Sequence, residues 1–283
     1  MKSVLSILKA TARHFKTYNG ARMGAALSYY AVFSIAPLGI LIIALVGSVF
    51  GARLVESSII NQAERLIGGG AGEFIESIIT GITTQSLSVV GTILSIATIL
   101  FGAISLLSVL DTSIDKLWET KTAREQRQSF FTKIVFNLKK RLPVFSILPI
   151  IALLFLFFVA VSVFLSLFAE QLSGLGASIH YIEPVALFIL GTVFFALIYR
   201  ILPDRTLPAK ELLLGGAVTS TLFLIGRLLI GFYIAIFAHT SLYGAAGSLV
   251  VILIWIYYSS QVFFFGASFT YMYSKKYGYL SKK

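Results

Sequence analysis

The chain has 283 residues, of which 57% are hydrophobic and only 12% are charged, a composition typical of membrane proteins rather than soluble domains. It has no cysteine, which excludes a disulfide framework, a thiolate nucleophile and cysteine-based metal sites. The net charge of +11 would also suit a nucleic-acid-binding protein, but the positions of the charges indicate a membrane topology instead.

The apolar runs are continuous rather than alternating, which predicts an all-α integral membrane protein and not a β-barrel. We expect a single membrane domain, residues 1–283, that begins with a cytoplasmic interfacial helix in residues 1–20. Most of the apolar runs reach the roughly 20 residues that cross a bilayer core. The six predicted transmembrane helices are residues 24–50, 89–110, 143–169, 184–200, 212–238 and 246–272.

Lysine and arginine are concentrated in alternate connections between these spans. There are five in residues 1–23, eight in 111–143, three in 200–211 and four in 272–283, against two in 51–88 and none in 170–184 or 238–245. Because cytoplasmic connections carry the excess of basic residues, this pattern places both termini in the cytoplasm. The expected partners of this charge are anionic membrane lipids, and not nucleic acid.

The N-terminal segment, residues 2–18, is predicted to be a basic amphipathic helix on the inner membrane surface. Its apolar face consists of Val4, Leu5, Leu8, Ala12 and Phe15. His14 falls on the polar side, where we expect it to be solvated.

Pro37 interrupts the first predicted span, with Tyr29, Tyr30 and Ser34 just before it. Proline removes one backbone hydrogen bond and displaces a carbonyl, and in lipid such a break needs protein or a cavity to satisfy the freed groups. A neighbouring helix could fill the kink, or the break could border a substrate path. Both interpretations stay open at this stage.

The connection between the first two spans, residues 51–88, is expected to form an outer helical hairpin. The glycine-rich residues 68–72 divide it into two short amphipathic segments. Long connections in compact proteins often serve as lids or binding elements, so this hairpin is expected to cap the outer mouth.

Beyond the second span, Asp111, Asp115 and Glu119 recur every four residues as an acidic cluster on the cytoplasmic side. Three carboxylates at this spacing could hold a divalent cation. Such rows more often pair with basic neighbours, here Lys116 or Lys121, and we therefore predict no metal site.

Arg227 is the basic residue inside a predicted span. It lies roughly 15 residues, or about 22 Å, from the cytoplasmic start of that span, where snorkelling to either surface would be strained. Tyr257 and Tyr258 in the last span reach a similar depth, as does Pro37. A guanidinium offers a fork of donors suited to phosphate or carboxylate, so we predict a binding site for an anionic headgroup. A structural arginine, satisfied by carbonyls and tyrosine hydroxyls, is the alternative.

The complete predicted substrate site adds Gln261, one turn nearer the cytoplasm, and the residues around the proline break. Its members are Arg227, Tyr257, Tyr258, Gln261, Tyr29, Tyr30, Ser34 and Pro37. The predicted outer mouth consists of His239, Tyr243 and Gly244.

Four passages of the sequence resemble the YihY/BrkB family of bacterial inner-membrane proteins, and the resemblance as a whole extends over nearly the entire chain. They are ARMGAALSYYAVFSIAPLGILIIALVGSVFG at 21–51, the stretch 111–118, RILPDRTLPAKELLLGGAVTS from Arg200, and LYGAAGSLVVILIWIYYSSQVFFFGASFTYMY at 242–273. The resemblance implies a six-helix protein of the bacterial cytoplasmic membrane, and a basic residue at Arg227 fits the family pattern. Ser268 stands where the family often has an acidic residue, so a mechanism that requires a carboxylate there does not carry over.

The resemblance also implies several activities, because the family has carried a ribonuclease label, a link to virulence or serum resistance, and a suggested role in moving lipids. The residues disfavour a nuclease, since the topology separates His14, His180 and His239 across the membrane. We predict a transporter or flippase for an anionic lipid or lipid-linked cell-envelope precursor, which is not an enzyme and has no cofactor. The main alternative is a non-catalytic membrane scaffold for envelope assembly, as a homo-oligomer or with partner enzymes. A channel or a ribonuclease ranks below both.

Overall fold

The computed structural model describes a part of the chain that is helical or in turns, with no strand among its residues. The described residues are 2–32, 51, 53, 56, 57, 59–61, 72, 75–77, 80, 105, 106, 108–120, 179–203, 205–237 and 244–282. The predicted span 143–169, most of 89–110 and most of the outer hairpin lie outside them, as do Ser34, Pro37, His239 and Tyr243. Over the part described, the all-α prediction is confirmed.

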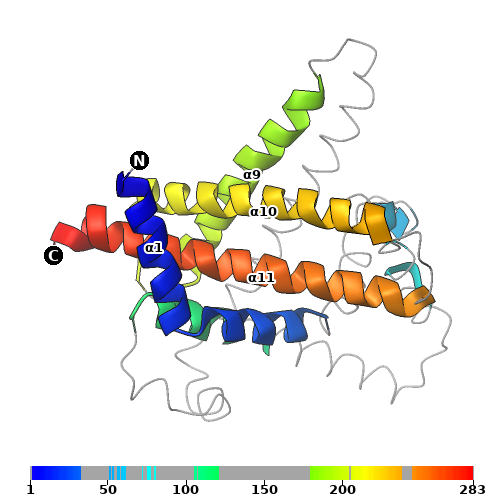
Figure 1. The fold of residues 1–283 in the computed structure, drawn as a ribbon, viewed down its shortest axis with the longest axis horizontal. Helices are drawn as coiled ribbons and strands as arrows, with labels where there is room; N and C mark the ends of the chain where they lie inside the picture. Colours follow the sequence, from blue (N-terminus) through cyan, green and yellow to red (C-terminus); the bar gives the residue numbers. More distant parts are fainter. Residues whose placement is uncertain are drawn as a thin grey trace. The chain divides into compact units, whose positions relative to one another are not determined.

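The labelled helices are 16 to 34 residues long (Figure 1). They are α1 (Lys2–Thr17), α9 (Ile179–Ile201), α10 (Ala209–Phe237) and α11 (Gly244–Tyr277), and a short 3-10 helix, Tyr279–Lys282, ends the described chain. Residues 20–32 and 108–117 are also helical. The helix predicted in residues 1–20 is therefore confirmed as α1.

Three of these helices contain a stretch long and apolar enough to cross a membrane: Pro184–Ile201, Ala209–Ile230 and Ile252–Tyr277. They coincide with the last three predicted spans, and α11 continues five residues beyond the predicted end at residue 272. The structure thus confirms helices at three of the six predicted spans.

The chain divides into two compact units. The first comprises residues 1–23, 107–223 and 261–283, and the second comprises 24–106 and 224–260. The first unit contains the contacts that join α1, α9 and the N-terminal part of α10 to the C-terminal part of α11.

Within this unit, small residues bring α10 and α11 into close contact. Gly215 on α10 faces Thr270 on α11, and Gly266 on α11 faces Thr219 on α10, so a Cβ atom on either glycine would overlap the opposite threonine. Each threonine hydroxyl donates to the carbonyl four residues earlier in its own helix, at 2.8 Å, and so stays hydrogen-bonded where it is buried. Small residues at helical spacing permit this close approach between membrane helices.

Two fully buried aromatic side chains donate hydrogen bonds to the backbone of α11. Tyr199 of α9 donates from Oη to the carbonyl of Phe263 at 2.7 Å, and its Oη lies 3.0 Å from Oγ1 of Thr219. Trp118, which follows helix 108–117, donates from Nε1 to the carbonyl of Ala267 at 3.1 Å. Because a buried donor without a partner costs about 1–3 kcal/mol, these bonds stabilise the packing of two separate segments against α11.

The close contact of α10 and α11 predicts the behaviour of a double-mutant cycle. Gly266→Ala should lower the free energy of unfolding by about 1–3 kcal/mol, because the new methyl group overlaps the Thr219 side chain and forces the helices apart. Thr219→Ala in the same protein should recover part of this loss. Unfolding followed by circular dichroism in detergent would measure both effects, and strictly additive losses would contradict the contact.

Candidate functional site

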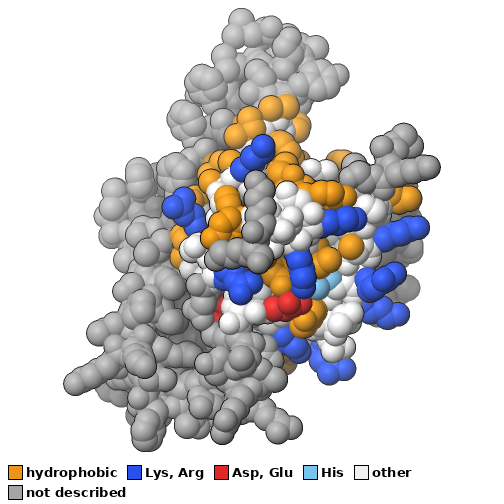
Figure 2. All heavy atoms as spheres, turned by 90° about the vertical axis from the view of Figure 1, so that its left-hand side faces the viewer, with side chains coloured by type: hydrophobic (Ala, Val, Ile, Leu, Met, Phe, Trp, Pro, Cys, Tyr) orange, Lys and Arg blue, Asp and Glu red, His pale blue; other side chains and the backbone are white. Residues whose placement is uncertain are grey.

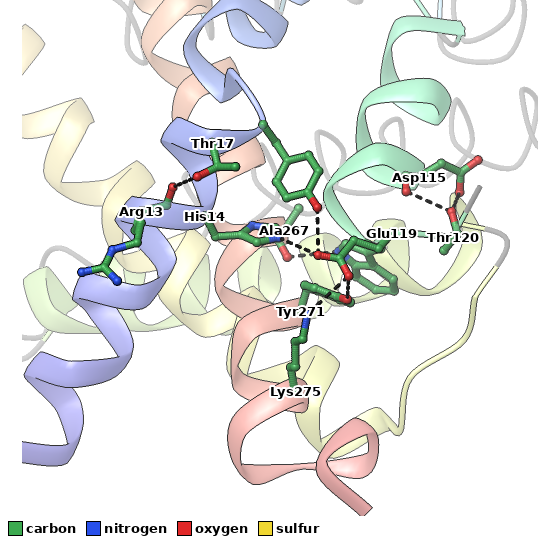
Figure 3. Close-up of polar contacts among 11 residues, drawn as sticks. Arg13, His14, Thr17, Asp115, Glu119, Thr120, Ala267, Tyr271 and Lys275 are labelled. Atoms are coloured by element: carbon green, nitrogen blue, oxygen red, sulfur yellow. Dashed lines mark hydrogen bonds and ion pairs between the residues drawn. The ribbon is translucent and has the colours of Figure 1, made fainter. Parts of the chain in front are cut away.

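The densest group of ionisable side chains in the described part of the chain gathers around Glu119 (Figure 3). We call it the Glu119 cluster; it consists of His14, Tyr18, Glu119, Tyr271 and Lys275. Its members come from α1 and the turn after it, from the turn after helix 108–117, and from α11. All of them belong to the first compact unit.

Glu119 adopts a left-handed backbone conformation, with φ of 51°. The amide of Thr120 donates to the carbonyl of Asp115 at 3.0 Å, a hydrogen bond typical of a helix C-terminus. In this motif the left-handed position, here Glu119, is usually glycine. A residue with a Cβ atom is disfavoured there, by about 1–3 kcal/mol. The interactions of the Glu119 carboxylate offset this cost.

Three donors meet at that carboxylate. Oε1 accepts from Tyr18 Oη at 2.9 Å, and Oε2 accepts from Tyr271 Oη at 2.8 Å and from Lys275 Nζ at 3.3 Å. Burial alone would raise the pKa of Glu119, but the hydrogen bonds from Tyr271, Tyr18 and Lys275 outweigh it and lower this pKa below its ordinary value. Glu119 is therefore ionised at neutral pH.

The structure changes the interpretation of the acidic row 111, 115 and 119. The helix ends at residue 117, so the Glu119 side chain leaves the face it was expected to share with Asp111 and Asp115. Its cationic partner is Lys275, 156 positions along the chain, rather than a neighbour such as Lys116. Asp115 accepts from Thr120 Oγ1 at 2.8 Å, and no group of three metal-ligating side chains occurs among the described residues.

The prediction that His14 is solvated is wrong, since only 8% of the residue is exposed. Its ring lies between those of Tyr18, at 4.6 Å between centroids, and Tyr271, at 5.3 Å. Nε2 lies 3.9 Å from Oε1 of Glu119, at the outer limit of an ion pair, and neither ring nitrogen has a hydrogen-bond partner. Burial lowers the pKa of His14, and although Glu119 opposes this shift the imidazole is favoured in its neutral form.

Basic side chains gather on the face of the molecule around this cluster (Figure 2). The view shows lysine and arginine at many points, acidic side chains at few, and hydrophobic side chains between them. A face of this kind attracts anions, because few acidic side chains on it would repel them.

Arg227 lies in α10, about 27 Å along the helix from Ala209 and about 15 Å from Phe237. Its side chain is half-buried, and no hydrogen bond or ion pair is recorded for it within the part of the chain that the structure describes. The ring of Tyr258 packs on the adjacent Gly226, where a Cβ atom would overlap ring carbons Cε1 and Cδ1. The structure thus brings Tyr258 next to the α10 backbone at the level of Arg227.

The structure also describes four other residues of the predicted substrate site. Tyr257 is exposed, and Gln261 donates from Nε2 to the carbonyl of Ala21 at 3.0 Å, which links α11 to the start of helix 20–32. Tyr29 and Tyr30 form an edge-on aromatic pair at 5.4 Å. The predicted outer-mouth residue Gly244 is the first residue of α11.

Ser268, at the position where the resemblance leads one to expect an acid, is fully buried in α11. Its hydroxyl has no hydrogen-bond partner in the structure. It lies one turn from Tyr271 on the helix, and therefore close to the Glu119 cluster along the same face.

Comparison with known sequences identifies the protein family. A sequence model described as virulence factor BrkB matches residues 11–283. A UPF0761 membrane protein of Pseudomonas aeruginosa is 25% identical over 264 residues, which is 90% of this chain and 60% of that protein. One of Psychromonas ingrahamii is 28% identical over 252 residues, which is 86% of this chain and 79% of that protein. The chain thus spans about three fifths of the length of the Pseudomonas relatives, and no solved structure matches it.

The hydrogen bonds to Glu119 predict that removing the hydroxyl group of Tyr18 or Tyr271 destabilises the protein. Tyr18→Phe and Tyr271→Phe should each lower the free energy of unfolding by about 1 kcal/mol, because each removes a hydrogen bond to an ionised and partly exposed carboxylate. Tyr273→Phe is the matched control, since its hydroxyl makes no hydrogen bond among the residues that the structure describes and its ring contact with Phe269 persists. Equal stability of all three variants in detergent unfolding would refute a stabilising role for the cluster.

The lowered pKa of His14 predicts that the protein loses stability as the pH falls. In the unfolded chain the pKa of His14 is near its ordinary value of 6.5, whereas in the folded chain this pKa is lower. The unfolded chain therefore binds the proton first as the pH falls, and acid favours the unfolded state. Melting temperatures measured between pH 8 and pH 5 should therefore decrease, and His14→Gln should flatten the decrease. A melting temperature that rises on acidification would show that the ion pair with Glu119 outweighs burial.

Proposed function

This chain belongs to the virulence factor BrkB family of membrane proteins, and from that premise we propose that it is a transporter or flippase for an anionic lipid or lipid-linked cell-envelope precursor. In this proposal it works in the bacterial cytoplasmic membrane with both termini in the cytoplasm. It catalyses no chemical reaction and requires no cofactor. The headgroup of the transported molecule binds Arg227.

The observation that supports this proposal is a guanidinium in an apolar helix with no acidic partner among the described residues. The membrane-crossing stretch Ala209–Ile230 contains Arg227 near one end and charged residues only at the other, Lys210 and Glu211. Glu211 is engaged elsewhere, because its Oε1 accepts from the amide of Tyr279 at 2.7 Å. A charge held in an apolar medium without a counter-ion is costly, and a phosphate or carboxylate of the transported molecule would reduce that cost.

The surroundings of Arg227 suit an amphiphile rather than a soluble anion. Ile225, Leu228 and Leu229 are 44%, 73% and 59% exposed, so apolar surface borders the guanidinium along α10. Acyl chains can lie on that surface while the headgroup meets the guanidinium. Tyr258, packed against Gly226, is the aromatic residue we assign to the headgroup site.

The proposal predicts the effect of removing the charge. Arg227→Ala should reduce headgroup-dependent transport in proteoliposomes at least about tenfold, because charge-assisted hydrogen bonds are worth about 1.5–3 kcal/mol. Leu213→Ala alters an exposed leucine of the same helix, 14 residues before Arg227, and removes no charge; it is the matched control and should transport normally. Transport would be followed with a fluorescent phosphatidylglycerol that becomes accessible to dithionite on crossing the bilayer.

Full transport by a correctly folded and inserted Arg227→Ala protein would refute the binding of the headgroup at Arg227. A scaffold would behave differently, because its cellular role would survive Arg227→Ala and would depend on the basic segment 111–143 instead.

A further inference from the structure

Helix α1 contacts α11 through a face that is not its most apolar one. The buried residues of this face are Ile7, Thr11 and His14, and Thr11 is completely inaccessible to solvent. Thr11 Oγ1 donates to the carbonyl of Ile7 at 2.9 Å, so its hydroxyl is satisfied within the helix. Residues 7, 11 and 14 recur at the spacing of one helical face.

Three contacts with α11 fix this orientation. Lys276 Nζ donates to Ser6 Oγ at 2.9 Å, His14 lies against Tyr271, and the rings of Phe15 and Phe265 are 5.9 Å apart in an edge-on arrangement. These α11 residues all belong to the membrane-crossing stretch that ends at Tyr277. Helix α1 is therefore attached to the last turns of a membrane-spanning helix.

The orientation leaves the apolar stripe of α1 uncovered. Leu5 is 58% exposed and Leu8 is 39% exposed, and Ala12, one turn further along, is exposed as well. At 100° per residue the centre of this stripe lies about 130° from the centre of the buried face. Thus α1 has an apolar surface that α11 does not use.

A basic stripe borders the apolar one. Lys9 and Lys16 are exposed, and at 100° per residue they follow Leu5 around the helix on the side away from α11. Helix α1 contains no acidic residue that could neutralise them.

We propose that α1 binds the anionic headgroup layer of the membrane, with Leu5, Leu8 and Ala12 in the boundary between headgroups and acyl chains and with Lys9 and Lys16 on lipid phosphates. Attachment to the end of a membrane-spanning helix keeps α1 within reach of that layer, and the alternation of apolar and basic stripes matches its chemistry. A soluble acidic protein would match the lysines but would leave the leucines in water. This interaction is independent of any binding at Arg227.

The absence of cysteine from the chain makes a direct test possible with single labels. Leu8→Cys and Thr17→Cys, both at exposed positions of α1, would each carry a nitroxide in the full-length protein reconstituted into nanodiscs. One set of nanodiscs contains phosphatidylcholine alone and the other contains one third phosphatidylglycerol. Collision of each label with oxygen, which concentrates in lipid, and with a water-soluble nickel chelate gives its environment.

In nanodiscs with phosphatidylglycerol, the proposal predicts a several-fold higher ratio of oxygen to nickel accessibility for the Leu8 label than for the Thr17 label. The ratio at Leu8 should fall in phosphatidylcholine alone, and it should fall equally when Lys9→Gln and Lys16→Gln are combined in the presence of phosphatidylglycerol. A Leu8 label that nickel reaches freely in both lipids would overturn the proposal, because α1 would then lie in water. A Leu8 label shielded from both reagents would also overturn it, since protein would cover the stripe. A ratio insensitive to lipid charge and to both lysines would overturn the role given to the phosphates.

Discussion

Hydrogen-bonding groups that enter a bilayer must find partners inside the protein, and this requirement explains how the first compact unit is joined to α11. Tyr199 and Trp118 are completely buried, and each directs its donor to a carbonyl of the same stretch of α11. The helix can accept these bonds because glycine and threonine let α10 approach its backbone closely. The packing of small residues and the buried hydrogen bonds therefore depend on each other: without the close approach, Tyr199 could not lie against Thr219 and reach Phe263 at once.

The same requirement separates the Glu119 cluster from Arg227, two polar sites in the described part of the chain. At the Glu119 cluster each carboxylate oxygen accepts a hydrogen bond. These bonds offset the cost of the left-handed backbone conformation of Glu119. This is a structural solution, which joins α1 and α11 to the end of helix 108–117. At Arg227 no such solution exists among the described residues, and the guanidinium keeps its hydrogen-bonding capacity in an apolar helix. We assign function to the second site for that reason.

Much of the fold follows from local sequence, and the contacts of the Glu119 cluster do not. Continuous apolar length predicted the helices at 184–200, 212–238 and 246–272, because a bilayer imposes one length on every span. The burial of His14 could not be predicted from α1 alone: the helix presents two faces that could be buried, and only the position of α11 decides between them. His14 with Tyr18, and Tyr271 with Lys275, do recur at helical spacing, which marks two polar faces. However, the bond from Tyr18 to Glu119 joins residues 101 positions apart, and no local pattern specifies that pairing.

The central claim is that Arg227 holds an anionic headgroup, and lipid retention measured by native mass spectrometry tests it most directly. Protein purified from a membrane with equal amounts of phosphatidylethanolamine and phosphatidylglycerol would be released from detergent, and its bound lipids would be counted. The account predicts that the wild-type and Leu213→Ala proteins retain phosphatidylglycerol and that Arg227→Ala retains at least one molecule fewer. Equal retention of phosphatidylglycerol by all three proteins would contradict it.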